Sequence, residues 1–273
     1  MPLQWLRPAS LALVFALYAL LVSAAEVNPG GQSREPGDVE WAKWFAIVQQ
    51  KALEYSDTLP DFICVQTTRR YSGTGDTYAW VTRDVLEAEL SFNQRAERYS
   101  HIRLNGKPKK GPIESLGGAW SIGEFGSLLR TLFLPETQTE FTNEGREQLQ
   151  DLAVIIMKFR VLKERSRWTL SFENSHSLNV AYHGRVWVDA SNHQILKINQ
   201  RTFPLPPTFP ITYSEITTLY NYVSVSGLEG KKFLLPQTAH VILHERQPPI
   251  RSLNVIDFRD YRKFTADVRL VPE

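Results

Sequence analysis

Two histidines four residues apart are the feature of this sequence that comes closest to a metal site. His240 and His244 flank the apolar tripeptide Val-Ile-Leu, and on a helix this spacing would place both imidazoles on one face, where they can share a zinc ion. The segment alternates polar and apolar residues, however, which is the pattern of a strand. Four strand residues span about 13 Å, whereas zinc holds its nitrogen ligands at about 2 Å. The sequence therefore predicts two polar histidines on a strand and no metal site.

The other residues with catalytic potential are scattered along the chain. His176, His183 and His193 have no carboxylate at a spacing typical of a catalytic pair, and Asp257 and Asp260 are expected to pair with neighbouring bases. The sequence has no serine-nucleophile elbow, no phosphate-binding loop and no cysteine–histidine motif. We therefore predict no catalytic residue, no cofactor and a non-enzymatic protein. A hydrolase with dispersed residues stays an alternative, because carboxylate pairs are defined by their separation in space.

Charge and cysteine content narrow the class of protein. Lys and Arg total 31 against 29 Asp and Glu, a net charge of +2, which disfavours nucleic acid as a partner. A single cysteine excludes a disulfide-stabilised scaffold. Cys64 lies between Ile63 and Val65 in a strand-like segment, so we expect a buried, unreactive thiol, with a disulfide between two chains as the alternative. The protein is expected to be a monomer.

The N-terminal residues have the features of a secretory signal peptide. Arg7 precedes an uncharged apolar segment, and small residues follow it up to Ala25. Cleavage is predicted after Ala24 or Ala25, with an uncleaved membrane anchor as the alternative. A periplasmic or secreted protein is expected, in which peripheral contact with the envelope is allowed. The predicted organisation is a signal peptide (1–25), a flexible leader rich in Gly and Pro (26–37), one β domain (38–268) and a C-terminal tail (269–273).

Two amphipathic helices are predicted. From Asp38 to Tyr55, aromatic and apolar residues recur every three or four positions and so share one face, and Asp38 is placed to cap the N-terminus. A second helix begins at Ser121, which has the spacing of a capping box with Glu124, and ends before Pro135. Such apolar faces must be buried against a large surface, most simply a sheet.

Nearly all other segments are predicted to be strands joined by short turns, with residues 151–156 left open between a strand and a helical turn. Strands of twelve or more residues span about 40 Å, which suits an open barrel. The predicted fold class is α+β: a mostly antiparallel, strongly curved sheet that forms an incomplete β-barrel, with two helices covering its concave face. The expected strands are 62–71, 77–92, 95–104, 158–163, 167–173, 179–188, 194–201, 213–225, 233–246 and 251–264.

This order of elements, with Gly184-Arg-Val-Trp-Val-Asp189 followed by Gln194-Ile-Leu-Lys-Ile198, resembles the LolA and LolB type of periplasmic lipoprotein carriers and the related lipid-binding lipoproteins. Leu59-Pro-Asp-Phe-Ile-Cys64 and Tyr261-Arg-Lys-Phe-Thr265 also resemble phrases in a family of exported bacterial proteins. The resemblance spans residues 38 to 264. It implies an unclosed barrel whose helices cover an apolar cavity for acyl chains. No arginine matches the one that locks the lid of the carriers, so energy-coupled transfer is not implied.

The leading hypothesis is therefore a non-enzymatic exported protein that binds a lipid, an acyl chain or a lipid-modified protein in an apolar cleft between sheet and helices. Burial of an acyl chain contributes about 0.8 kcal/mol per methylene and needs no polar motif. A structural or protein-interaction module of the envelope with a filled core is the alternative, since the same residues can pack into a dry core. The predicted ligand-binding residues are Trp41, Trp44, Phe45, Phe125, Leu128, Leu129, Leu132 and Phe133.

Overall fold

The computed structural model describes residues 36–74, 79–116, 127–172 and 176–265. The predicted signal peptide, nearly all of the leader, the C-terminal tail, the predicted helix start at Ser121 and the candidate residue Phe125 lie outside the described residues. Among those that are described, no helix combines the length and the apolar character that crossing a membrane requires.

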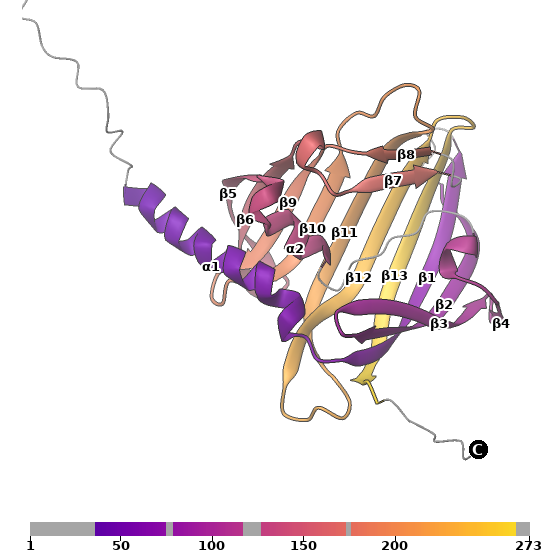
Figure 1. Cartoon of the computed structure of the whole chain (residues 1–273), viewed down its shortest axis with the longest axis horizontal. Helices are drawn as coiled ribbons and strands as arrows, with labels where there is room; N and C mark the ends of the chain where they lie inside the picture. The colour runs from indigo at the N-terminus through magenta and orange to yellow at the C-terminus, as the bar shows by residue number, and fades with distance from the viewer. Residues whose placement is uncertain (1–35, 75–78, 117–126, 173–175, 266–273) are drawn as a thin grey trace, which may run out of the picture.

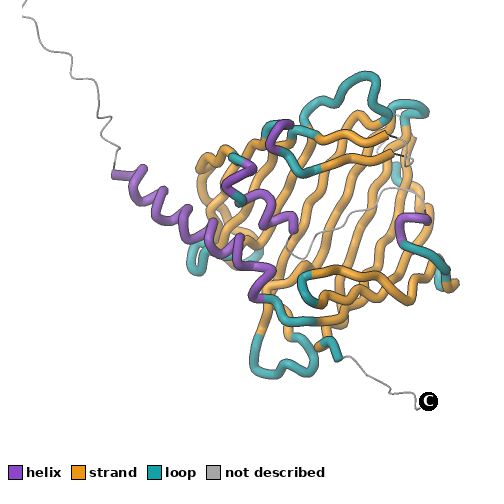
Figure 2. Tube along the Cα trace, viewed as in Figure 1, coloured by secondary structure: helices purple, strands orange, loops and turns teal. Residues whose placement is uncertain are grey.

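The main element is an open antiparallel sheet of eleven strands in the order β4-β3-β2-β1-β13-β12-β11-β10-β9-β6-β5. It curves around one face without closing (Figures 1 and 2), which confirms the predicted incomplete barrel. Neighbouring strands are mostly consecutive in the chain, and the pairing of β1 with β13 joins the two halves. The strands are β1 (Phe62–Thr74), β2 (Val81–Asn93), β3 (Ala96–Leu104), β4 (Lys107–Pro108), β5 (Glu140–Leu149), β6 (Leu152–Val161), β9 (Tyr182–Asp189), β10 (Ile195–Thr202), β11 (Ile211–Ser224), β12 (Lys232–Glu245) and β13 (Ile250–Lys263).

Two strands lie outside this sheet. β7 (Thr169–Phe172) and β8 (His176–Asn179) form a separate antiparallel hairpin, which lies across the upper end of the main sheet (Figure 1). The segment Phe203-Pro-Leu-Pro-Pro-Thr-Phe-Pro210, between β10 and β11, is a proline-rich loop. Its Phe209 is buried with Leu170 of β7 and Ile211 of β11, and this contact fixes the loop against the hairpin.

The helix α1 (Pro36–Thr58) packs on the concave side of the sheet. It begins two residues before Asp38, so the prediction that Asp38 caps it is wrong. Val48, Ala52 and Tyr55 of this helix are buried in the main core, and the Tyr55 hydroxyl donates a hydrogen bond of 2.8 Å to the carbonyl of Leu234 on β12. Because the apolar positions recur at helical spacing, they share one face of α1, which is buried from Val48 to Tyr55 and half-buried at Trp41, Trp44 and Phe45.

The short helix α2 (Ser127–Phe133) lies against α1. Gln49 of α1 donates to the Phe133 carbonyl (3.1 Å), and Arg130 of α2 donates to the Leu53 carbonyl (2.9 Å). The first bond satisfies a carbonyl of the last turn of α2 that helix geometry leaves free, and the second joins α2 to a carbonyl within α1. Both helices cover the half of the sheet formed by β6, β9 and β10.

Two neighbouring strands, β5 and the first part of β6, were not predicted as strands from the sequence. Residues 140–149 form β5, and residues 151–156, left open between a strand and a helical turn, belong mostly to β6. β5 is an edge strand with a mainly exposed, polar surface, so it lacks the alternation that would announce a strand. Its formation depends on pairing with the apolar strand β6.

Candidate binding site on the concave face

The predicted ligand-binding residues of α2 lie within the core. Leu129, Leu132 and Phe133 are at most 1 % exposed, and Leu128 is half-buried against the same cluster. They contact residues of α1 and of strands β6, β9 and β10. The structure thus brings the predicted residues of the two helices together over one half of the sheet.

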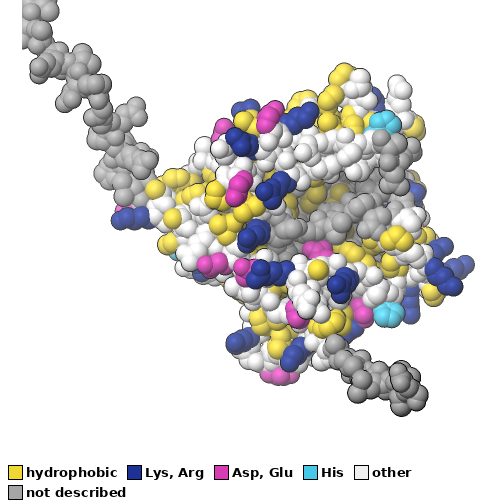
Figure 3. Space-filling view, viewed as in Figure 1, with side chains coloured by type: hydrophobic (Ala, Val, Ile, Leu, Met, Phe, Trp, Pro, Cys, Tyr) yellow, Lys and Arg dark blue, Asp and Glu magenta, His cyan; other side chains and the backbone are white. Residues whose placement is uncertain are grey.

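The predicted residues of α1 form an aromatic surface. Trp41 stacks on Trp44 with ring centroids 5.2 Å apart, and Phe45 lies 6.2 Å from Phe133 of α2. Phe133 in turn stacks on Phe141 of β5 at 4.8 Å. The three aromatic side chains of α1 are only half-buried, and hydrophobic side chains gather along this helix in Figure 3. This half of the molecule therefore presents an apolar surface next to a well-packed core.

The centre of the concave face differs from the helix-covered half, because polar side chains point inward from successive strands. Buried polar residues alternate along each strand with outward-facing residues, so they occupy positions in phase with core residues. Thr218 lies in phase with Ile216 on β11, and Gln200 with Ile198 on β10. The buried polar side chains of this concave floor are Gln66 and Thr68 on β1, Gln200 and Thr202 on β10, Ser214 and Thr218 on β11, and Ser252 and Asn254 on β13.

Three atoms of this floor have no hydrogen-bond partner among the residues that the structure describes. They are Oε1 of Gln66, Oε1 of Gln200 and Oγ1 of Thr218, each on a side chain no more than 5 % exposed. Thr218 and Gln200 are diagonal neighbours, because Gln200 pairs with Ile216 and Ile198 with Thr218. Leaving a buried polar group unpaired costs about 1–3 kcal/mol, so a satisfied core does not account for this arrangement. These residues were not predicted, because the sequence shows polar positions on a strand without showing which face points inward.

An ion pair between β1 and β2 lies at one side of the concave floor. The Arg70 guanidinium on β1 makes two hydrogen bonds to the Asp84 carboxylate on β2, at 2.5 and 2.9 Å. Both side chains are nearly buried. Such a paired arrangement of two parallel hydrogen bonds is the strongest that a guanidinium makes with a carboxylate.

Two apolar clusters flank the floor. One lies under the helices, and the other is formed by β1, β2 and the lower parts of β11, β12 and β13. Leu59, just after α1, and Trp168, just before β7, contact both clusters. The concave face therefore combines extensive apolar surface with a small number of buried hydrogen-bonding groups, which is the composition of sites for small molecules.

A cavity opens where β12 and β13 part. Their pairing ends at Thr238 and Asp257, although β12 begins at Lys232 and β13 continues to Lys263. The space between them measures about 810 Å³, is open to solvent and is lined on one side by the β11–β12 loop. Its lining residues include Val223, Val225, Leu228, Pro236, Phe258 and Tyr261, with Lys231, Lys232 and Arg259 among the charged ones.

Cys64 is buried and free, as predicted for an inert thiol. Burial raises the pKa of its thiol, with the Glu97 carboxylate adding to the effect, and the thiolate is the reactive form. We expect no reaction of the native protein with a maleimide and complete labelling after unfolding in guanidinium chloride. A Ser100→Cys variant, which places a thiol at an exposed position, is the matched control and should label at once. Fast labelling of native wild-type protein would contradict the buried position.

The histidines of the described residues are scattered over the molecule. In the described ranges no group of three or more His, Cys, Asp or Glu side chains is arranged to hold a metal ion, and His240 lies exposed on a strand. Ser100 Oγ and Glu89 Oε1 each lie 3.3 Å from His101, but both contact the same ring atom, Nδ1. A serine triad needs the hydroxyl and the carboxylate on opposite ring nitrogens, so this cluster is no hydrolase site.

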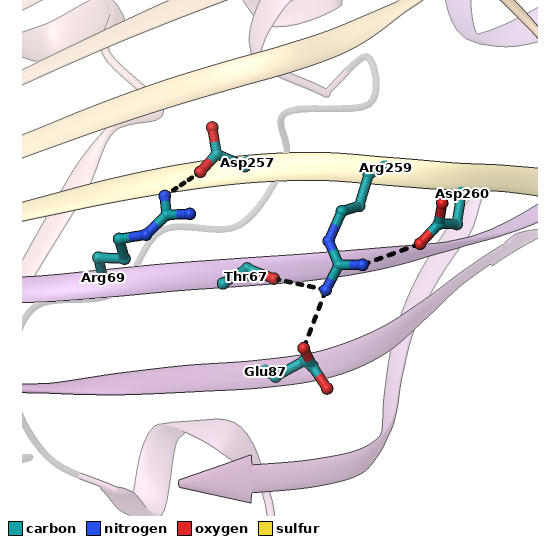
Figure 4. A network of polar contacts seen from close by, with 6 residues as sticks. All are labelled: Thr67, Arg69, Glu87, Asp257, Arg259 and Asp260. Atoms are coloured by element: carbon teal, nitrogen blue, oxygen red, sulfur yellow. Dashed lines mark hydrogen bonds and ion pairs between the residues drawn. The ribbon is translucent and has the colours of Figure 1, made fainter. Parts of the chain in front are cut away.

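The convex face carries paired charges. Asp257 accepts a hydrogen bond from Arg69, and Arg259 contacts both Glu87 and Asp260 at 3.0 Å (Figure 4). The prediction that the aspartates pair with bases adjacent in the sequence is confirmed for Asp260, which contacts Arg259; Asp257 instead pairs with Arg69 of β1, which strand pairing brings beside it. β13 is not an edge strand, however, since β1 and β12 lie on either side of it.

In a second group of paired charges on this face, Glu144 contacts Arg185 and Lys158, and its pKa can be measured by titration. Hydrogen bonding from Arg185, together with Lys158, lowers the pKa of Glu144 to about 2. Because the pKa falls on folding from 4.5, this pairing stabilises the fold above about pH 4.5 and is lost as the pH falls toward 2. We expect an NMR titration to give a Glu144 midpoint near 2, and Arg185→Gln to raise it. An unchanged midpoint in Arg185→Gln, as expected for the distant control Arg69→Gln, would show that the pair does not hold in solution.

Comparisons with known proteins concern the fold. No protein-family model matches the sequence, and no curated protein matches it. Similar solved structures include a LolA superfamily protein from Nitrosomonas europaea (12% identity, 80% of this chain and 93% of that chain, TM-score 0.34). A second is a domain of an outer membrane lipoprotein-sorting protein from Vibrio parahaemolyticus (12% identity, 81% of this chain and 92% of that chain, TM-score 0.39). A third is a DUF1329 family protein from Desulfovibrio piger (10% identity, 84% of this chain and 94% of that chain, TM-score 0.37). LolA-type proteins are thus among the solved structures that this chain resembles, as the sequence predicted, and none of these similarities assigns a ligand or a residue role.

Proposed function

We propose that this chain is an exported, non-enzymatic binding protein of the cell envelope. Its ligand is a lipid, an acyl chain or a lipid-modified protein, held between the concave face of the sheet and the two helices. The apolar part of the ligand contacts the aromatic surface of α1 and the cluster under α2, and its polar part lies over the concave floor.

The observation that carries this proposal is the set of unpaired buried atoms on the concave floor. Oε1 of Gln200 and Oγ1 of Thr218 lie next to the apolar side chains of Ile198 and Ile216. A hydroxyl or amide hydrogen of a ligand would satisfy them, while its hydrocarbon chain covers the surrounding apolar surface. Each buried methylene contributes about 0.8 kcal/mol, and each new hydrogen bond about 1 kcal/mol. An amphiphile with a hydroxyl or amide group near its chain fits both requirements.

Extraction of the purified protein tests this proposal. Protein prepared without detergent is extracted with organic solvent, and the extract is examined by mass spectrometry for stoichiometric lipid. We expect lipid in the wild type and at least about ten-fold less in a Thr218→Val, Gln200→Leu variant, which corresponds to losing two hydrogen bonds of about 0.7 kcal/mol or more each.

The matched control is Thr238→Val, which removes a hydroxyl from β12 on the opposite face of the sheet. It should retain the wild-type amount of lipid. A clean extract from wild-type protein, together with unchanged melting temperature on addition of lipid, would exclude lipid binding.

A protein-interaction module is the second candidate, and the parting of β12 and β13 favours it. The residues of β12 before Thr238 and those of β13 after Asp257 no longer pair with each other, so the facing edges of the two strands border the cavity. Ser226 already exchanges backbone hydrogen bonds with Tyr261 and Lys263 of β13, so an extended peptide could add by backbone hydrogen bonds only to the remaining part of these edges. Fluorescence anisotropy with labelled extended peptides tests this candidate. Binding should be lost in Leu228→Asp, which places a charge in the cavity wall, and kept in Leu228→Ile; peptides that bind both variants equally would exclude this cavity as the site.

A further inference from the structure

The convex face of β6, β9 and β10 carries three basic side chains in one row. Arg160 on β6 pairs with His183 on β9, and His183 pairs with Arg201 on β10. The side chains of directly paired residues lie on the same face of a sheet. The two arginines are exposed and stand two strand spacings apart, about 10 Å. Both guanidinium groups can therefore reach an ion placed over His183.

This row departs from the charge pairing of the rest of the convex face. Arg69, Arg185, Arg259 and Arg262 each contact a carboxylate within 4.0 Å. No such contact to Arg160 or Arg201 is found in the part of the chain that the structure describes. The two arginines stand on either side of His183 rather than directly opposite each other, so one oxyanion above the imidazole can accept hydrogen bonds from both.

The nearest carboxylate on this face is already engaged. Glu215 on β11 pairs with Arg201 in the strand register, but its oxygens accept hydrogen bonds from Asn199 Nδ2, at 2.7 Å, and from the Tyr213 hydroxyl. On the other side, Glu144 is held by Arg185 and Lys158. Glu215 keeps its negative charge opposite Arg201, but among the described residues neither acid lies within 4.0 Å of the guanidinium group of Arg160 or Arg201.

Phe203, at the start of the proline-rich loop, orders two members of the row. Its ring lies 4.5 Å from the imidazole of His183, and the Arg160 guanidinium lies over it, 5.4 Å from the ring centroid. Cation–π contact of this kind holds an arginine in one orientation. The basic groups are therefore partly pre-organised, which lowers the entropic cost of binding an ion.

We propose that Arg160, His183 and Arg201 form an anion site on the convex face that binds a phosphate group. Two guanidinium groups and one imidazole supply donors suited to a tetrahedral oxyanion. The site lies on the opposite face of the sheet from the concave floor, so it is independent of the lipid-binding proposal. The phosphate is either free or part of a lipid headgroup, and the two sources are separated by experiment.

The titration of His183 provides a direct readout. Partial burial, and then the charges of Arg201 and Arg160, lower the pKa of His183. The groups around it are Arg160 on β6, Arg201 on β10, Arg185 on its own strand and the uncharged ring of Phe203; Glu215 lies beyond Arg201. A bound phosphate would stabilise the imidazolium, so phosphate is expected to raise the pKa of His183, and affinity is expected to fall as the pH rises through that value.

The test is an NMR titration of the full chain with inorganic phosphate, alongside flotation with vesicles of phosphatidylcholine containing phosphatidylglycerol. We expect saturable shifts of the His183 resonances and a raised His183 pKa in the wild type. An Arg160→Gln, Arg201→Gln variant should lose at least ten-fold in affinity. Vesicle binding that depends on these arginines, without a response to inorganic phosphate, would support the site with a lipid headgroup as the source.

The matched control is the double variant Arg69→Gln, Arg262→Gln. It also removes two positive charges from the convex face, but from arginines that are each ion-paired with a carboxylate. It should bind phosphate or vesicles as the wild type does, and thermal melting checks that both double variants are folded. If neither probe binds the wild type, the site is refuted. If both double variants lose binding equally, the site is also refuted, and the binding is general electrostatic attraction.

Discussion

Replacing Gly184 with alanine is expected to destabilise the fold by at least about 3 kcal/mol, the upper range for overpacked positions. A Cβ atom built on Gly184 of β9 would lie 1.9 Å from the carbonyl oxygen of Asn199 and 2.9 Å from the Cα atom of Gln200, both on β10. These are backbone atoms, so no side-chain rotation relieves the clash. Urea denaturation followed by circular dichroism measures the loss, and a fall in soluble yield should accompany it.

Gly230→Ala is the control for this substitution. Gly230 has a positive φ of 78° but nothing within 4 Å of its Cβ position, so only the backbone penalty of about 1–2 kcal/mol applies. Equal losses in the two variants would mean that the close approach of β9 and β10 does not exist in solution. The same experiment gives a physical reason for the first residue of Gly184-Arg-Val-Trp-Val-Asp189, since glycine permits this contact between strands.

Breaking the ion pair of Arg70 and Asp84 is the second large effect that we expect. Arg70→Met leaves the nearly buried Asp84 carboxylate with only the longer contact to Arg83 Nε, at 3.9 Å. Removing one member of a buried pair costs about 3–5 kcal/mol. The free energy of unfolding, measured by urea denaturation, should fall by that amount.

The neighbouring residue provides the control. Arg69 lies on the opposite face of β1, where its side chain is 47 % exposed and paired with Asp257, so Arg69→Met should cost less than about 1 kcal/mol. A double variant, Arg70→Met with Asp84→Leu, removes both buried charges and should recover much of the lost stability. Equal effects of Arg69→Met and Arg70→Met would contradict the burial of this pair.

The long strands and α1 were predicted from the sequence, because side-chain periodicity is a local property. Residues 213–225, for example, were predicted as a strand and form most of β11, and the residues from Trp41 to Tyr55 lie within α1. The edge strand β5 was missed because its polar surface shows no periodicity and its backbone is organised by β6. Similarly, the start of α1 at Pro36 could not be inferred from Asp38, whose type suits a cap but also an early helical position.

The candidate site was predicted only in part. The aromatic and leucine residues of α1 and α2 lie together over the sheet, and their role in binding stays a prediction. The concave floor was missed, because the sequence shows two faces for each strand without showing which one points inward. Thr218 and Gln200 became recognisable only when pairing placed them beside each other on the buried face.

By itself, the sequence determined the fold class, the apolar faces of both helices and the inert position of Cys64, since these follow from residue type and spacing within short segments. The tertiary structure alone decided which strand faces are buried, where β12 and β13 separate, and that Arg160, His183 and Arg201 stand in one row. The physical reason is that these features depend on the register between strands distant in the chain. A shift of one residue in that register would turn every side chain to the opposite face.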